Sequence, residues 1–199
     1  MEKIKDFVKE KLDSLNWAHT KDVVRLALEI AEKENADKEI VEIAAWFHGI
    51  GKSEPRRNVI YHHIKSVEIS EKFLKELKFE KSKIEKINQC IIEHMGPLNG
   101  YFLENLLKKE GKTWDFFKRP STKESKVLYD ADIINLLGPF GVIKRIFLES
   151  KMGVDFNDIV KNLMIESKEC LNDLQTEMGK KMGKEQYKKS KEFLDIVKL

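Results

Sequence analysis

Residues 19–30, HTKDVVRLALEI, place a histidine at the end of an amphipathic helical pattern. Val23, Leu26 and Ile30 follow His19 at the spacing of one helix face, so the histidine continues an apolar stripe. The same helical period recurs in nearly every segment of the 199-residue chain. No stretch shows the sustained alternation of apolar and polar residues that is typical of a half-buried strand. The sequence therefore predicts an all-α protein.

Glycine and proline mark breaks between predicted helices at residues 49–55, 96–97, 111–120 and 138–141. The predicted helices cover residues 3–15, 19–34, 38–48, 61–77, 82–95, 102–109, 122–137, 140–150, 155–177 and 184–197. We find no internal repeat, low-complexity linker or change in composition that would mark a second domain. We therefore expect one helical domain over residues 1–199, with a core at about 16–150 and the helices of 155–199 packed on it.

Composition excludes several classes of protein. The chain has 37 basic and 34 acidic residues, a net charge of +3, which does not indicate a nucleic-acid-binding face. It has only two cysteines, too few for a disulfide framework, and no apolar run long enough to span a membrane. These features predict a cytoplasmic protein with no membrane or nucleic-acid partner, and they leave its oligomeric state open.

Four of the five histidines are predicted to point inward. Besides His19, His48 shares a face with Val41 and Ala45, and His94 completes a stripe of isoleucines. Either His62 or His63 continues a fourth stripe. A single inward histidine is usually a core residue, but several buried imidazoles each need a polar partner, and a shared metal ion or anionic substrate would satisfy them jointly.

Two acidic residues strengthen the prediction of a metal site. Asp130 and Asp132 lie in an otherwise apolar helical segment, where a carboxylate requires a cation. Histidine and carboxylate ligands without thiolates suit Mn, Fe, Zn, Co or Ni rather than Ca. Such an ion lowers the pKa of bound water and polarises the bond under attack. The pattern therefore suggests a metal-dependent hydrolase.

The order of these motifs resembles the HD-domain superfamily of metal-dependent phosphohydrolases. The resemblance rests on His19, on WFHGIGK at 46–52, on the segment HHIKSVEISEKFLKEL at 62–77, on His94 and on DAD at 130–132. It extends to TEMGK at 176–180, and so covers most of the chain. It implies a helical bundle of the HD-domain type that holds a divalent transition metal.

The resemblance also implies roles for individual residues. It assigns metal ligation to His19, His48, residue 49 and Asp132, with Asp130 as the alternative to Asp132, and a second-metal position to His62 and His94. The aspartate of the family's His-Asp pair is Gly49 here, which offers no side-chain ligand. We therefore expect one ion rather than two. Asp22 and Glu93 are the nearby acids that could substitute as ligands, although for Asp22 a hydrogen bond to an imidazole is the expected use.

The loop after the motif supplies positive charge. Lys52, Arg56 and Arg57 are candidates to bind the phosphoryl oxygens of a substrate, and we expect Lys52 and Asp132 to act in catalysis. The first hypothesis is a phosphohydrolase that cleaves a small phosphate ester, a nucleotide or related metabolite, with metal-activated water. The alternative is a degenerate HD-domain protein that binds metal or nucleotide in a regulatory role without turnover, and Gly49 favours it.

Overall fold

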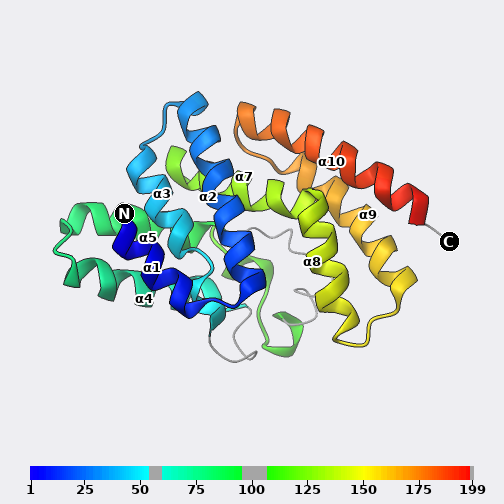
Figure 1. Ribbon diagram of the computed structural model, residues 1–199, viewed down its shortest axis with the longest axis horizontal. Coiled ribbons are helices and arrows are strands. Elements are labelled where there is room, and N and C mark those ends of the chain that lie inside the picture. The colour runs from blue at the N-terminus through cyan, green and yellow to red at the C-terminus, as the bar shows by residue number, and fades with distance from the viewer. Residues whose placement is uncertain (54–59, 96–106, 198–199) are drawn as a thin grey trace.

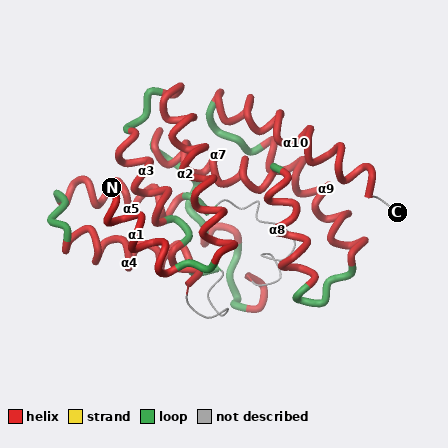
Figure 2. The backbone as a smooth tube through the Cα atoms, viewed as in Figure 1, coloured by secondary structure: helices red, strands yellow, loops and turns green. Residues whose placement is uncertain are grey.

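The computed structural model describes residues 1–53, 60–95 and 107–197 of the chain. Within these ranges the structure is built of helices and loops, with no strand, as Figure 2 shows. The all-α prediction is therefore confirmed. Arg56 and Arg57 lie outside the described residues, as does most of the predicted helix at 102–109.

The helices are labelled in Figure 1. Their bounds are α1 (Glu2–Lys11), α2 (Ser14–Glu34), α3 (Lys38–Phe47), α4 (His62–Glu76), α5 (Lys81–Glu93), α7 (Lys123–Leu137), α8 (Pro139–Ser150), α9 (Phe156–Asn172) and α10 (Glu177–Val197), with short 3-10 helices η1 (Ile50–Ser53) and η3 (Trp114–Phe116). Several helices begin at a capping side chain. Asp13, for example, accepts a hydrogen bond from the Asn16 amide, which starts α2 five residues before its predicted position.

The main core lies where α2 packs against α3 and α7, with α5 against both α3 and α7. Because α2 and α3 bury small or branched side chains such as Val23, Ala27, Val41 and Ala44, their backbones can approach closely. Helices α4 and α5 form an antiparallel pair on one side of this core (Figure 1). The arrangement brings the end of α3, the start of α4 and the middle of α7 to the same region.

The C-terminal helices α8, α9 and α10 pack around a second apolar cluster that includes Val142, Ile159 and Leu163. An ion-pair cluster joins α8 to α9, since Arg145 pairs with the buried side chains of Glu149 and Glu166. No described helix combines the length and the apolar character that crossing a membrane requires.

One helix prediction was wrong in this region. The segment predicted as a helix over 155–177 ends at Asn172, and α10 begins at Glu177 rather than at 184. The cause is Asp130 on α7, whose carboxylate accepts hydrogen bonds from the amides of Gln175 and Thr176 and holds them in a turn. Gly179, which lies between the predicted helices, is part of α10, and a Cβ atom there would come within 2.1 Å of Asp130 Oδ2.

Candidate metal centre

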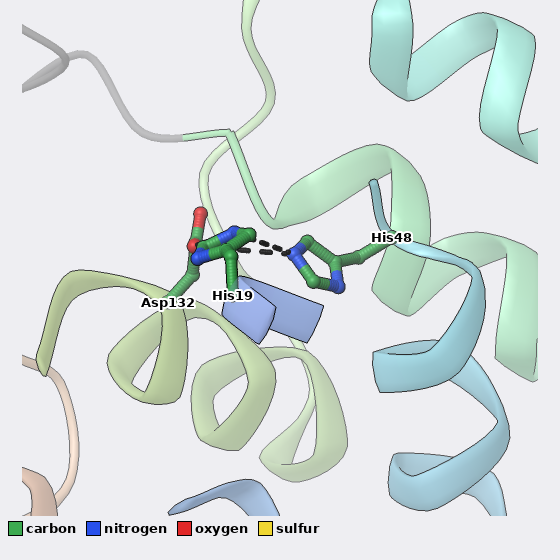
Figure 3. Close-up of side chains that lie close together, drawn as sticks. All are labelled: His19, His48 and Asp132. Atoms are coloured by element: carbon green, nitrogen blue, oxygen red, sulfur yellow. Dashed lines mark hydrogen bonds and ion pairs between the residues drawn. The ribbon is translucent and has the colours of Figure 1, made fainter. Parts of the chain in front are cut away.

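His19, His48 and Asp132 converge from three elements that are far apart in sequence (Figure 3). His19 lies in the second turn of α2, His48 follows the last residue of α3, and Asp132 lies in the middle of α7. All three are buried, and their ligand atoms lie within 4.8 Å of one another. His19 Nε2 is 3.1 Å from His48 Nε2 and 3.2 Å from Asp132 Oδ1.

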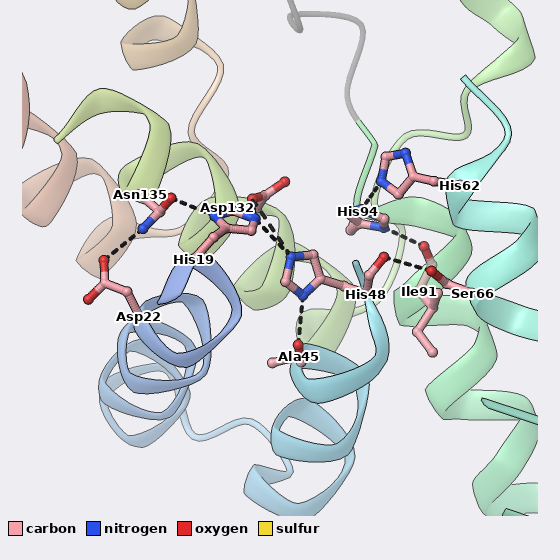
Figure 4. Close-up of polar contacts among 10 residues, drawn as sticks. All are labelled: His19, Asp22, Ala45, His48, His62, Ser66, Ile91, His94, Asp132 and Asn135. Carbon is pink, nitrogen blue, oxygen red and sulfur yellow. Dashed lines mark hydrogen bonds and ion pairs between the residues drawn. The ribbon is translucent and has the colours of Figure 1, made fainter. Parts of the chain in front are cut away.

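Hydrogen bonds on the far side of each ring fix where its proton lies (Figure 4). His48 Nδ1 is 2.6 Å from the carbonyl oxygen of Ala45, which can only accept, so Nδ1 carries the proton. Asn135 donates from Nδ2 to Asp22, which turns its Oδ1 towards His19 Nδ1 at 2.7 Å. His19 Nδ1 must therefore also be the protonated nitrogen, and both Nε2 atoms present lone pairs.

The site consequently gathers three electron-pair donors with no proton between them. The Nε2 atoms of His19 and His48 and the Oδ1 atom of Asp132 face one another, and this oxygen is buried without a hydrogen-bond partner among the described residues. Mutually repelling lone pairs in a buried position are stabilised by a cation placed among them. The residues present therefore fit a divalent metal with two imidazole ligands and one carboxylate ligand.

The protonation states agree with this arrangement. Burial lowers the pKa of His19 to about 4 and that of His48 to about 3, so both rings are neutral at pH 7, the form that binds metals. Burial acts to raise the pKa of Asp132, but the pKa lies well below its usual range, and the positive charge of Lys52 is one cause. Asp132 is therefore ionised at neutral pH.

A second pair of histidines lies beside this group. His62, the first residue of α4, has its Nε2 atom 3.2 Å from His94 Nε2, and the His94 ring is 5.2 Å from that of His48 between centroids. His94 Nδ1 donates to the carbonyl oxygen of Ile91. His63 instead packs against Phe116 and Phe117, so His62 is the residue of this pair that faces the site. Among the described residues, no carboxylate or third imidazole completes a separate group around His62 and His94.

The loop after His48 is held close to α4. Ser66 Oγ donates to the carbonyl oxygen of His48 and accepts from the amide of Gly51, which fixes the start of η1 (Figure 4). The approach requires glycine at position 51, because a Cβ atom there would lie 2.2 Å from the carbonyl oxygen of His62. These contacts bring Lys52 near the centre, where it is half-buried and acts electrostatically on Asp132.

Gly49 leaves room for a larger side chain. A Cβ atom at this position would meet only Thr20 Oγ1, at 3.7 Å, an ordinary contact. Thr20 Oγ1 is itself buried without a hydrogen-bond partner among the described residues. Neither candidate substitute acid takes this place: Asp22 contacts His19 only through Asn135, and Glu93 accepts hydrogen bonds from Ser121.

The two acids of the DAD segment have separate surroundings. Asp132 faces the histidines, whereas Asp130 accepts three hydrogen bonds from Gln175 and Thr176 near the start of α10. The structure thus brings Asp132, and not Asp130, into the histidine cluster. Their two-residue separation on a helix explains why they point in different directions.

Sequence reasoning missed one charged residue near the centre. Lys144 on α8 is only 7% exposed, and the charges of Lys52 and Asp132 both act on it. Burial first, and then the charge of Lys52, lower the pKa of Lys144 to about 7. No sequence pattern distinguishes Lys144 from the many surface lysines, because its burial arises from the packing of α8 against α7.

In a comparison with protein families, the model of the HD domain fits residues 16–136, more than half of the chain. Among curated proteins, an uncharacterized protein of Clostridium beijerinckii is 35% identical over 97 residues, which make up 48% of this chain. The chain spans 62% of the length of that relative.

Solved structures share the fold. Bacillus subtilis YpgQ superposes with a TM-score of 0.72 and 21% identity, covering 98% of this chain and 92% of its own. The same protein has been solved in complex with ADP, with a TM-score of 0.70. A predicted HD superfamily hydrolase from an uncultured Thermotogales bacterium has a TM-score of 0.67 and 20% identity, covering 99% of this chain and 90% of its own.

Proposed function

Because this chain belongs to the HD-domain family, a family of metal-dependent hydrolases, we propose that it is a metal-dependent phosphohydrolase that cleaves a small phosphate ester. The proposal rests on one observation: two imidazole nitrogens and a carboxylate oxygen converge in a buried site with no proton between them. A nucleotide or related metabolite is the proposed substrate class. The ADP complex of YpgQ, which has the same fold, supports testing nucleotides first.

The proposed ligands are His19, His48 and Asp132, which would hold one divalent transition-metal ion. The chemistry supplied by such an ion, when bound, is Lewis acidity, which lowers the pKa of water and offsets charge on a phosphoryl group. Asn135 Oδ1 accepts a hydrogen bond from His19 Nδ1 and so orients the His19 ring. The carbonyl oxygen of Ala45 accepts from His48 Nδ1 and orients that ring in the same way. Asp132 keeps a negative charge directed at the site.

The residues around the ligands are proposed to bind the substrate. Lys52 approaches the centre from η1, where its ammonium can neutralise phosphoryl oxygens, and Arg56 and Arg57 follow it in the chain. His62 and His94 are proposed to line the adjacent part of the pocket rather than to hold a second ion, because Gly49 provides no carboxylate to join two ions.

The metal-binding proposal is tested by comparing substitutions of Asp132 and Asp130, the two aspartates of α7. Asp132→Asn removes the charge at the histidine cluster with little change in shape, and Asp130→Asn changes the carboxylate that holds Gln175 and Thr176. We expect the first variant to lose manganese binding and hydrolysis while remaining folded. We expect the second to unfold at lower temperature but to bind manganese when folded.

Manganese binding is measured by calorimetry and electron paramagnetic resonance on chelator-treated protein, and hydrolysis by phosphate release from a panel of nucleotides. If Asp132→Asn bound manganese as tightly as the unchanged protein, the assigned ligands would be wrong. Because Asp130→Asn is an equally conservative change two residues away, it separates loss of the ligand from damage to the helix.

Gly49 favours a second candidate function, a metal- or nucleotide-binding regulatory module without turnover. The space at this position accepts the Cβ atom of a side chain without a clash, so Gly49→Asp is the variant that tests a fourth ligand. If the unchanged protein binds manganese and nucleotide but releases no phosphate, while Gly49→Asp releases it, the regulatory role is favoured. If the unchanged protein itself releases phosphate in a manganese-dependent way, the hydrolase proposal stands.

A further inference from the structure

Lys144 is a largely buried lysine without a counter-ion among the described residues. Lys144 is only 7% exposed, yet its ammonium forms no hydrogen bond and no ion pair with any described residue. A buried charge without a partner destabilises a folded protein, because lost hydration is not replaced. By contrast Arg145, the next residue, pairs with two glutamates. An unpaired lysine inside the fold therefore indicates a position that an anion fills.

The packing of α8 determines where this lysine points. Gly141 lies against the end of α7, where a Cβ atom would come within 2.3 Å of the Leu136 carbonyl oxygen and 2.5 Å of that of Asn135. Lys144 follows Gly141 by three residues and so shares its helix face. This face is directed at α7, which carries Asp132 one turn before Asn135. The close contact at Gly141 thus turns Lys144 towards the histidine cluster.

Two lysines reach this region from different elements. Lys52 comes from η1 and Lys144 from α8. The charge of Lys52 acts on Lys144, and the charge of Asp132 acts on both lysines. The only carboxylates whose charges act on Lys144 belong, among the described residues, to Asp132 and Asp13, and neither forms an ion pair with it. When Lys144 is protonated, one carboxylate at the centre cannot neutralise two ammonium groups and a divalent ion. The remaining charge is positive, and it suits a multiply charged anion.

We propose that Lys144 binds the phosphoryl group of the substrate from the side of α8, together with Lys52 from η1. This inference rests on the proposed function and adds a substrate-binding residue to it. The anion would contact two ammonium groups from separate helical elements, an arrangement that orients a tetrahedral group better than a single flexible lysine does.

The test is the binding of inorganic phosphate, measured by calorimetry on the full chain with and without manganese. Lys144→Met keeps the length of the side chain but removes the charge, and Lys144→Gln is a second, polar replacement. Lys151→Met is the matched control, because Lys151 lies at the end of the same helix, on the surface over Phe147.

We expect both Lys144 variants to bind phosphate about tenfold or more weakly, as is typical when a charge-assisted hydrogen bond is lost. Thermal unfolding of Lys144→Met in the absence of phosphate should occur at the same or a higher temperature, since a buried unpaired charge is removed. Lys151→Met should bind phosphate as the unchanged protein does.

Equal phosphate affinity in the Lys144 and Lys151 variants would overturn the proposal. So would a weaker phosphate affinity that is accompanied by a lower unfolding temperature in both Lys144 variants, because that would indicate a structural role. Manganese affinity is measured in the same samples and separates the two proposals. If the unchanged protein does not bind manganese, the proposed metal centre is wrong. If manganese binds normally and the Lys144 variants bind phosphate as the unchanged protein does, only the role of Lys144 is wrong.

Discussion

Lowering the pH from 7 to 5 is expected to unfold the metal-free protein, because several buried imidazoles must remain neutral in the folded chain. Burial lowers the pKa of His19 to about 4 and those of His48, His63 and His94 to about 3. In the unfolded chain these groups return to a pKa of about 6.5. Between these values the unfolded state binds more protons than the folded state, so stability falls as the pH falls.

The size of the effect follows from the pKa values. Between pH 7 and pH 5 each histidine weakens folding by about 2 kcal/mol, and four together by about 7 kcal/mol. Asp130 acts in the opposite direction, because burial raises its pKa to about 6 and its folded form takes up a proton first. This proton uptake adds about 1 kcal/mol to the free energy of unfolding. The net loss of about 6 kcal/mol is comparable to the whole stability of a typical domain.

Urea unfolding followed by circular dichroism at pH 7, 6 and 5, in the presence of a chelator, measures this loss. His63→Phe tests its origin, because His63 packs against Phe116 and Phe117 and lies outside the metal ligands. Between pH 7 and 5, the free energy of unfolding of this variant should fall by about 2 kcal/mol less than that of the unchanged protein. A free energy of unfolding that changes by less than about 2 kcal/mol between pH 7 and 5 would refute the reasoning.

Three further variants test contacts that support the site. Gly51→Ala is expected to destabilise the fold by about 3 kcal/mol in urea unfolding, because its Cβ would overlap the His62 carbonyl oxygen; wild-type stability would contradict the described loop. Asn135→Ala should weaken manganese binding about tenfold in calorimetry by freeing the His19 ring, and unchanged affinity would show that the hydrogen bond is dispensable. Arg145→Met should cost about 3 kcal/mol by leaving two glutamates buried without their partner, and replacing both glutamates by glutamine in the same chain should recover most of that loss.

The sequence predicted His19 and His48 on one ground and Asp132 on another. The histidines stand on apolar helix faces, and the helical period alone places them inward. The choice of Asp132 over Asp130 could not be made in this way, because α7 is buried on nearly all sides and its pattern does not distinguish one face from another. The resemblance to a family favoured Asp132, and the direction of each carboxylate became visible only in the fold.

Tertiary contacts explain what the sequence did not predict. Gly179 and Gly183 lie outside the predicted helices, but in the structure each lies inside α10, where a Cβ atom would come within 2.1 Å of Asp130 and 2.3 Å of Leu174, respectively. The sequence does not distinguish Lys144 from the other lysines, and in the structure it is buried three residues after the close contact at Gly141. In each case a glycine permits a close approach between neighbouring helical segments, and local propensity carries no information about the partner.

The anchoring of the C-terminal segment by Asp130 has a consequence for any shortened form of this protein. The HD-domain match ends at residue 136, but the donors to Asp130 are at positions 175 and 176, in the turn before α10. A chain that stopped after α8 would leave a buried carboxylate without donors, two residues from Asp132. A minimal engineered metal centre therefore has to include the turn at 173–176 and the start of α10, although these residues lie about forty positions beyond the family match and contribute no ligand.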